Sequence, residues 1–205
     1  DTRALVPRPE TEELVDMAKK SLEGIASPFV VEVGTGTGAI AIACAKEILG
    51  AKVLATDISD DALALARENA EANGLGTTAT DTAAATLTLA KGDLLGAGTD
   101  AANIDCLIAN LPYIPDSEKG KLQPEVDKFD PELALYGGPD GLTLVRKLLE
   151  QTEGKLSAGA SVLLEIGSEQ AAVLETEAVK YPWLEFSGSH KDFCGNIRFV
   201  SYKAK

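Results

Sequence analysis

The sequence contains few of the residues on which metal sites and nucleophilic catalysis usually depend. It has one histidine, His190, and three cysteines that form no C-x-x-C pair, namely Cys44, Cys106 and Cys194. His190 lies between Ser189 and Lys191, a polar setting that predicts a solvated loop residue. The cysteines lie in or near apolar stretches, which predicts buried or partly buried free thiols in a reducing cytosol. We therefore expect no metal site and no Ser-His-Asp triad.

Positive charge and long apolar runs are also scarce. Lys and Arg number 19 against 32 Asp and Glu, so the formal net charge at pH 7 is -13. A surface of this sign repels nucleic-acid phosphates, which disfavours DNA and RNA as substrates. No apolar run approaches the roughly 18 residues of a membrane span and no signal peptide opens the chain, so we expect a cytoplasmic protein without membrane contact. The first residue is Asp1 rather than Met, and we expect a fragment that has lost upstream sequence.

The chain does contain a regular alternation of strand-like and helix-like segments. At 205 residues, 45% of them apolar, it is long enough for one α/β domain with a sizeable core. The apolar spacing predicts helices over 10–22, 39–49, 60–72, 141–153 and 169–179, and strands over 29–33, 52–56, 87–90, 104–109, 161–166, 183–187 and 197–202. Loops are expected over 76–85 and over 112–139, which holds five prolines.

Repeated strand–helix units predict a mostly parallel sheet covered on both faces. The two consecutive strands at the C-terminus predict an antiparallel hairpin at one edge. We therefore expect a Rossmann-like α/β fold with a seven-stranded sheet. No linker or repeat divides the chain, so we expect a single catalytic domain over 1–205, with a leading segment and helix over 1–24 and the core over 25–205.

A glycine-rich turn, Gly34-Thr35-Gly36-Thr37-Gly38, follows the first predicted strand and opens a helix. Glycine lets the backbone turn tightly and approach a ligand closely, and a turn in this position is typical of a nucleotide site. Asp57 ends the next strand, 23 residues after Gly34, with Ile58 beside it. A carboxylate there can accept hydrogen bonds from both hydroxyls of an adenosine ribose.

Two cofactors compete for this arrangement. The residues Gly34-x-Gly36-x-x-Ala39 satisfy the looser dinucleotide fingerprint, in which a helix N-terminus holds a pyrophosphate. Glu32, two residues before the first glycine, suits a cationic ligand and favours S-adenosylmethionine. Asp93 and Leu94 follow the third strand, where the carboxylate can bond an adenine amino group and the leucine can cover the ring. With these acidic partners the glycine turn predicts an S-adenosylmethionine site.

The turn Asn110-Leu111-Pro112-Tyr113 follows the fourth strand, at the carboxyl edge where open α/β sheets bind ligands. An amide or amine that is being methylated needs acceptors for its N–H groups, so that the nitrogen lone pair points at the sulfonium methyl. The Asn110 side-chain oxygen and the Leu111 carbonyl can supply them. Pro112 stiffens the turn, and Tyr113 offers a flat face to a planar group. We expect catalysis by positioning and fixed dipoles, without a covalent intermediate.

These motifs together resemble the HemK/PrmC family of protein-(glutamine-N5) methyltransferases, which modify the Gly-Gly-Gln loop of peptide-chain release factors. The resemblance covers nearly the whole chain. The run Val6-Pro7-Arg8-Pro9-Glu10-Thr11-Glu12 is similar to the family's segment leading into the catalytic domain, and 110–113 to its Asn-Pro-Pro-Tyr motif. Further matches are Asp130-Pro131, Ala134-Leu135, Gly137-Gly138, Asp140-Gly141-Leu142, Leu164-Glu165-Ile166-Gly167 with Gln170, and 191–198.

The resemblance implies a class I S-adenosylmethionine-dependent methyltransferase fold and a product, S-adenosylhomocysteine. It implies that Gly34 to Gly38 and Asp57 bind the cofactor, that Leu94 flanks the adenine, and that 110–113 hold the substrate glutamine. Arg8-Pro9-Glu10 is similar to the segment that shapes the glutamine pocket, and its presence favours a release factor over a ribosomal protein as partner. We expect the enzyme to act as a monomer.

The sequence departs from the family in two places. Leu111 stands where the family has its first proline, and Asn-Leu-Pro-Tyr is also known among enzymes that methylate adenine N6 in RNA. Adenine-N6 methylation of nucleic acid therefore stays open as an alternative, opposed by the -13 charge. The family's helical N-terminal domain is absent from this sequence, which leaves a cofactor-binding module without turnover as a second alternative. A dehydrogenase is the third.

Overall fold

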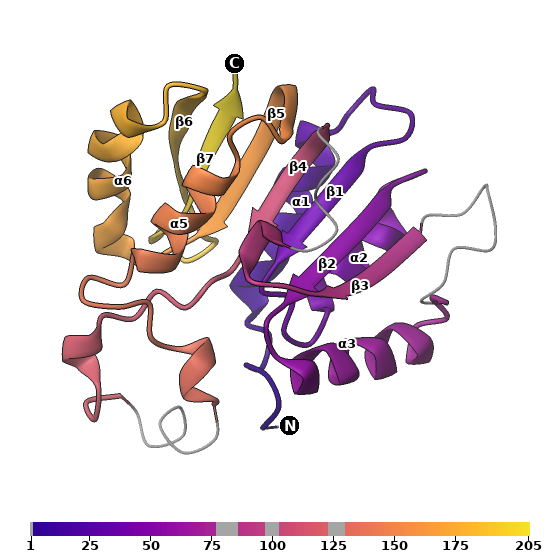
Figure 1. Ribbon diagram of the computed structural model, residues 1–205, viewed down its shortest axis with the longest axis horizontal. Coiled ribbons are helices and arrows are strands. Elements are labelled where there is room, and N and C mark those ends of the chain that lie inside the picture. Colours follow the sequence, from indigo (N-terminus) through magenta and orange to yellow (C-terminus); the bar gives the residue numbers. More distant parts are fainter. Residues whose placement is uncertain (1, 77–85, 97–102, 123–129) are drawn as a thin grey trace.

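The computed structural model describes residues 2–76, 86–96, 103–122 and 130–205. These residues form one seven-stranded sheet in the order β3-β2-β1-β4-β5-β7-β6 (Figure 1). β7 is antiparallel to both of its neighbours, and the other pairs are parallel. The strands are β1 Phe29–Val33, β2 Lys52–Asp57, β3 Thr86–Lys91, β4 Ile104–Ala109, β5 Leu156–Glu165, β6 Leu184–Lys191 and β7 Ile197–Ala204. The predicted parallel sheet with a C-terminal antiparallel hairpin is confirmed.

Helices cover both faces of the sheet. α1 (Glu12–Ser21), α2 (Ala39–Glu47) and α3 (Asp60–Ala72) pack on one side, and α5 (Thr143–Gln151) and α6 (Ala171–Glu177) on the other (Figure 1). α3 begins where the sequence predicts, because Ser59 Oγ accepts a hydrogen bond from the Ala62 amide at 3.2 Å. The short 3-10 turns are Pro9–Thr11, Leu94–Gly96, Asp116–Glu118, Glu132–Ala134, Ser168–Gln170 and Ala178–Lys180.

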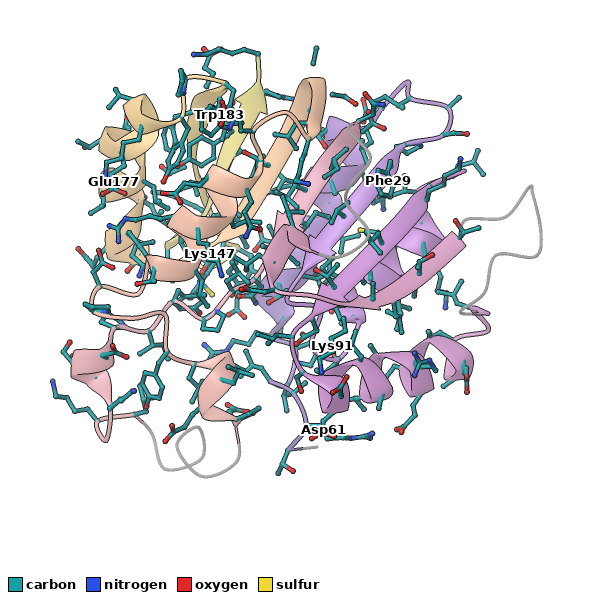
Figure 2. The ribbon with its side chains drawn as sticks, viewed as in Figure 1. Phe29, Asp61, Lys91, Lys147, Glu177 and Trp183 are labelled. Atoms are coloured by element: carbon teal, nitrogen blue, oxygen red, sulfur yellow. The ribbon has the colours of Figure 1, made fainter. Side chains whose placement is uncertain are left out.

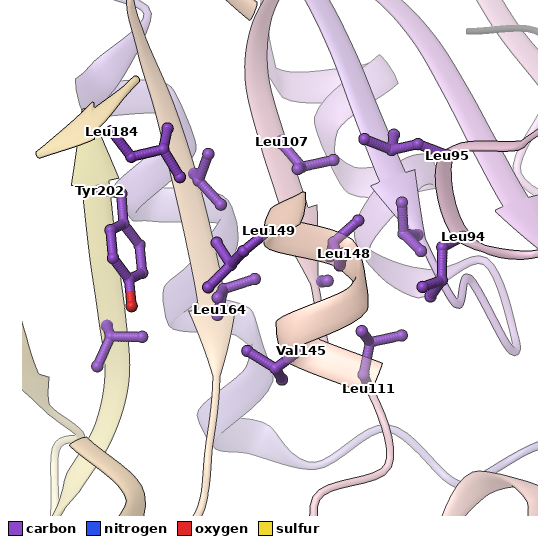
Figure 3. Packing of buried hydrophobic residues seen from close by; sticks show 14 of the residues in the cluster. Leu94, Leu95, Leu107, Leu111, Val145, Leu148, Leu149, Leu164, Leu184 and Tyr202 are labelled. Carbon is purple, nitrogen blue, oxygen red and sulfur yellow. The ribbon is translucent and has the colours of Figure 1, made fainter. Parts of the chain in front are cut away.

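Two apolar clusters fill the space between the sheet and these helices. Val145, Leu148 and Leu149 of α5 pack against the central strands on one face (Figure 3), and α1 and α2 bury a second cluster on the other. β4 is buried almost throughout, which is why it reads as a continuous apolar run. Trp183, immediately before β6 (Figure 2), donates from Nε1 to Thr152 Oγ1 at 2.9 Å and so ties the start of β6 to the end of α5. No helix within the described ranges has the length and apolarity needed to cross a membrane.

The segment after β4 folds back on itself at the carboxyl end of the sheet. The Ile114 amide donates to the Leu135 carbonyl at 3.0 Å, and the Gly137 amide donates to the Ile114 carbonyl at 2.9 Å. Its described parts contain 3-10 turns but no longer helix or named strand, as the predicted loop over 112–139 requires. In Figure 1 this segment and the N-terminal residues lie at the same end of the molecule as the carboxyl ends of the parallel strands.

Three local predictions are wrong. β5 begins at Leu156, which pairs with Ile104 ahead of a register shift; the start of this strand is only partly buried and contains Gly159, so it lacks the apolar run that the prediction relied on. His190 lies in β6 rather than in a loop, half-buried, with Nε2 2.8 Å from Ser201 Oγ of β7. Cys194 is exposed, whereas Cys44 and Cys106 are buried as predicted. Most of the loop predicted over 76–85 falls outside the described residues.

Candidate active site

A cleft opens at the carboxyl ends of β1, β2 and β4. The chain leaves β1 toward β2 on one side and reaches β4 on the other, and open α/β sheets bind ligands where the strand order reverses in this way. The cleft has an empty volume of about 930 Å³, open solvent included. The predicted residues that line it are Gly34, Gly36, Asp57, Ile58, Asp93, Leu94, Asn110, Leu111 and Pro112.

Two further segments line the cleft, and neither was among the predicted cofactor-binding residues. The first is 3–5, where Ala4 is buried beside Gly36 and Arg3 forms a bidentate ion pair with Glu68 of α3 at 2.8 Å. The second is the segment after β4, which contributes Pro131, Leu133 and Ala134. The cleft is therefore bounded on two sides by segments that are far apart in the sequence and come together only in the folded chain.

The glycine turn is held tightly between β2, α3 and the turn after β4. The amides of Gly34 and Thr35 donate to a carbonyl of β2 at 2.8 and 2.9 Å. Gly34 and Gly38 have φ of 74° and 80°, a conformation that favours glycine. A Cβ on Gly34 would approach Leu111 Cδ2 to 3.0 Å, and one on Gly38 would approach Ala66 Cβ to 3.0 Å. Gly34 therefore allows the two predicted turns to touch, and Gly38 allows α2 to pack on α3.

Two backbone hydrogen bonds fix the Asp57 carboxylate, which still has acceptor positions free for a ligand. Its Oδ2 accepts from the Gly36 amide at 2.9 Å, and its Oδ1 accepts from the Ser59 amide at 2.9 Å. Each carboxylate oxygen has two acceptor positions, so one position on each oxygen is left for a partner in the cleft. This geometry fits a pair of vicinal ribose hydroxyls, as S-adenosylmethionine would present.

Glu32 lies behind the glycine turn rather than in the cleft. Its side chain is 2% exposed, and its Oε2 accepts from Thr35 Oγ1 at 2.5 Å and from the Ala41 amide at 3.1 Å. Thr35 is also buried, and Thr37 and Gly38 likewise stand outside the cleft lining. Burial raises the pKa of Glu32 to about 8, so the carboxyl group carries a proton at neutral pH. The position of Glu32 corrects the expectation of direct contact with a cationic ligand: it braces the turn against α2.

The raised pKa of Glu32 makes the stability of the fold depend on pH. Between the ordinary value of 4.5 and about 8 the folded state holds a proton that the unfolded state releases, so stability falls as pH rises through this window. The slope from this one group is about 1.4 kcal/mol per pH unit. Glu32→Gln keeps both hydrogen bonds but cannot titrate, and its melting temperature is expected to fall less between pH 5.5 and 8 than that of the unmodified chain. Thermal unfolding across that range measures this, with the exposed Glu175→Gln as control; parallel curves for all three proteins would contradict it.

Asp93 and Leu94 reach the cleft from the end of β3. Leu94 is buried and adopts a φ of 56°, which turns the chain so that both residues line the cavity. The Asp93 carboxylate forms an ion pair with Lys147 of α5, the residue labelled in Figure 2. Asp93 is about half exposed, so the pair contributes little stability by itself. An adenine amino group would share this carboxylate with Lys147.

In the turn after β4, Asn110 is partly exposed to the cleft and Leu111 is buried in the core. Among the described residues no hydrogen bond occupies Asn110 Oδ1, which leaves this oxygen as an acceptor beside the cleft. The Leu111 side chain packs in the same cluster as α5, which holds the turn against the core. Tyr113 lies outside the cleft lining; its hydroxyl is 3.5 Å from Arg198 Nη1, and burial raises the pKa of this phenol.

The side chain of Gln170, called the latch below, holds the turn after β4 on the side away from the cleft. Gln170 Nε2 donates to the carbonyl of Tyr113 at 2.8 Å and to that of Asp140 at 3.1 Å, while its Oε1 accepts from the Gly167 amide at 2.8 Å. Gly141 packs so closely that a Cβ there would lie 2.0 Å from the Tyr113 carbonyl oxygen. The sequence offered these residues only as family matches, without the contacts that explain them.

The predicted substrate segment Arg8-Pro9-Glu10 lies beside the same turn, outside the cleft lining. Arg8 and Pro9 are exposed and Glu10 is half-buried. The next residue, Thr11, is buried: its Oγ1 is 3.5 Å from Asn110 Nδ2 and donates to Glu165 Oε2 at 2.9 Å. Glu165 stands at the end of β5. Sequence reasoning assigned no role to Thr11 or Glu165, because nothing local relates two residues so distant in the chain.

Comparison with known proteins agrees with this geometry. The family described as "Methyltransferase domain" matches residues 30–126. The chain is 42% identical over 200 residues to a release factor glutamine methyltransferase of Moorella thermoacetica, covering 97% of this chain and 67% of that protein. It is 39% identical to the protein of the same name from Deinococcus radiodurans, covering 98% and 66%. Among solved structures, a ribosomal protein L11 methylase from Lactobacillus delbrueckii subsp. bulgaricus shares the fold with a TM-score of 0.67 at 23% identity, covering 100% of this chain and 83% of that one.

The chain spans about two thirds of the length of the curated relatives that it matches. Within that span lie the glycine turn, Asp57, the Asn-Leu-Pro-Tyr turn and the Gln170 side chain that holds it. The fold and the level of identity together show that this chain belongs to the release factor glutamine methyltransferase family.

Proposed function

We propose that this chain transfers the methyl group of S-adenosylmethionine to the side-chain amide nitrogen of a glutamine, in the Gly-Gly-Gln loop of a peptide-chain release factor. The observation that carries the proposal is the position of Asn110, whose Oδ1 atom is unoccupied beside a cleft that Gly34, Gly36 and Asp57 also line. The names of the relatives support a glutamine amide as the acceptor. Release factors act in the cytoplasm, which is where the proposal puts the enzyme, as a monomer.

On the cofactor side, this chain supplies a shaped cleft lined by two carboxylates, those of Asp57 and Asp93. S-adenosylmethionine, when bound, supplies a methyl group on a positively charged sulfur. Asp57 accepts the ribose hydroxyls with the two acceptor positions that its backbone bonds leave free. Gly34 and Gly36 let the backbone approach the ligand, and Leu94 covers the adenine. Glu32, Thr35, Thr37 and Gly38 contribute by holding the turn in shape.

On the substrate side, the turn after β4 supplies hydrogen-bond acceptors. The NH₂ group of a substrate glutamine can only donate hydrogen bonds, so it needs such acceptors. Asn110 Oδ1 and the Leu111 carbonyl accept the two N–H groups, and the nitrogen lone pair is thereby directed along the methyl–sulfur axis. One C–N bond forms as the C–S bond breaks, and the nitrogen releases one proton to solvent. Tyr113 provides a flat face for the planar amide, and Arg8-Pro9-Glu10 shape the entrance.

The decisive assay combines the chain with methyl-labelled S-adenosylmethionine and a purified bacterial release factor. One methyl group is expected on the glutamine of the Gly-Gly-Gln loop, assigned by mass spectrometry of the peptide. A release factor with alanine in place of that glutamine is the matched control and should take up no label. Structured RNA forms a further arm, because label on RNA alone would replace the proposal by adenine methylation. Cofactor binding with transfer to neither acceptor would support a binding module instead.

A further inference from the structure

Thr11 connects Asn110 to a buried carboxylate. Its Oγ1 lies 2.9 Å from Glu165 Oε2 and 3.5 Å from Asn110 Nδ2. Thr11 is 7% exposed and Glu165 is 1% exposed, so water does not compete for these bonds. The three residues come from the 3-10 turn Pro9–Thr11 and from the carboxyl ends of β4 and β5. Only the assembled sheet brings them into one chain of contacts.

The hydrogen-bonding capacity of these groups fixes the direction of each bond. An ionised carboxylate can only accept, so the Thr11 hydroxyl donates its single hydrogen to Glu165. The hydroxyl oxygen then has only lone pairs to offer Asn110, and it can bond the NH₂ group but not the carbonyl oxygen. The opposite orientation of the Asn110 amide would set two acceptors against each other in a buried place, which is costly.

We propose that Glu165 and Thr11 are positioning residues that fix the orientation of the Asn110 amide, so that its Oδ1 and not its Nδ2 faces the substrate nitrogen. The inference rests on the proposed function for the nature of that substrate. A glutamine NH₂ group can only donate, so an Asn110 amide turned the other way would present donor to donor. The separation of 3.5 Å is long for a hydrogen bond, and bonds of this kind tighten when substrate fills the site.

The direction of the hydrogen bonds from Thr11 depends on the protonation state of Glu165. The chain of contacts Glu165–Thr11–Asn110 is called the relay below. Burial raises the pKa of Glu165 above its ordinary value, the charge of Glu10 adds to this, and the Thr11 bond together with the charges of Arg198 and Arg8 oppose it. Tyr113 also lies within electrostatic reach of this carboxylate. When Glu165 takes up a proton it can donate to Thr11, whose own hydrogen is then free to bond the Asn110 oxygen. The Asn110 amide then adopts the opposite orientation, and kcat falls as pH drops through the raised pKa of Glu165.

Variants at Thr11 separate this role from a merely structural one. Thr11→Val keeps the shape and removes the hydroxyl, and it is expected to lower kcat about tenfold, the effect of one lost hydrogen bond, with the dissociation constant for S-adenosylmethionine unchanged. Thr11→Ser restores the hydroxyl and should restore kcat. Thr152→Val is the matched control, because it removes another buried hydroxyl, at the end of α5, and should lower the melting temperature but leave kcat alone. Full kcat in Thr11→Val, or no rescue by serine, would overturn the inference.

A second measurement needs no turnover. The chain has only five asparagines, so ¹⁵N-asparagine labelling gives few side-chain NH₂ signals, and Asn110→Ala identifies the relevant one. That signal is expected to shift in Thr11→Val and to titrate with a midpoint above the ordinary glutamate value. The titration, and the acid limb of the kcat profile, should both vanish in Glu165→Gln. An Asn110 signal that changes neither with pH nor in Thr11→Val would refute the relay. Failure of the wild-type chain to methylate any release factor would instead refute the proposed function, and this NMR test of the relay would remain valid.

Discussion

Replacing Asn110 with alanine is expected to lower kcat for methyl transfer roughly 100- to 1,000-fold, the cost of removing one preorganised polar group from a catalytic site. Alanine removes the Oδ1 acceptor, so the substrate amide loses one of the two groups that direct its lone pair. The backbone of the turn is held independently by Leu111 in the core and by the Gln170 latch, so the cleft keeps its shape. Steady-state kinetics with a release factor, together with calorimetric titration of S-adenosylmethionine, measures the two effects separately.

Two companion variants make this result specific. Asp57→Ala is expected to raise the dissociation constant for S-adenosylmethionine instead, because it removes the carboxylate that we propose accepts the ribose hydroxyls. Asn73→Ala changes the same residue type at an exposed position at the end of α3 and should leave both quantities alone. If Asn110→Ala retained normal kcat, or lost cofactor binding to the same degree as Asp57→Ala, the assignment of Asn110 to the acceptor side would be wrong.

Gly141→Ala is expected to damage the site from outside the cleft. A Cβ there would lie 2.0 Å from the Tyr113 carbonyl oxygen and 2.5 Å from Gln170 Nε2, and the φ of 77° already disfavours a side chain. The strain and the collision together should lower the free energy of unfolding by at least about 3 kcal/mol. The turn after β4 must shift to relieve the contact, and a displacement near 1 Å at a catalytic group lowers turnover about 100-fold.

The chain offers a close control for this variant. Gly159 of β5 has the same φ of 77°, but nothing lies within 4 Å of the position that its Cβ would take. Gly159→Ala should therefore show the backbone strain alone, about 1 to 2 kcal/mol, with kcat unchanged. Chemical denaturation and kinetics on both variants measure the difference. Equal losses of stability in the two would mean that the contact with Tyr113 and Gln170 is not what requires glycine at 141.

The order of the elements could be predicted from the sequence because each carries its own local pattern. β1 and β4 are apolar runs of strand length, α3 begins at a Ser cap, and the glycine turn joins a strand to a helix. Asp57 and Asn110 could be assigned to one site for the same reason, because parallel strands bring their carboxyl ends to one edge of the sheet. These predictions needed only the alternation of strand and helix, which is evident in the apolar pattern of the sequence.

Other features depend on contacts that no local pattern reveals. The position of Glu32, two residues before Gly34 in the sequence, suggested a ligand contact. Its side chain is instead directed toward the start of α2, where Thr35 Oγ1 and the Ala41 amide donate hydrogen bonds to it. His190 looked solvated among polar neighbours, yet antiparallel pairing with β7 half-buries it. Arg3, Thr11 and Glu165 were not assigned to the site at all, since their partners lie far along the chain.

The bond between Thr11 and Glu165 joins residues 154 positions apart, and this separation has a consequence during synthesis. Contacts of such long range form slowly and late. When residue 110 of 205 has been added, the nascent chain already contains the glycine turn, Asp57 and Asn110, but neither β5 nor β7 exists. Glu165, which orients Asn110 through Thr11, is therefore made after every residue that is proposed to hold the methyl donor, so the acceptor side of the site is completed last.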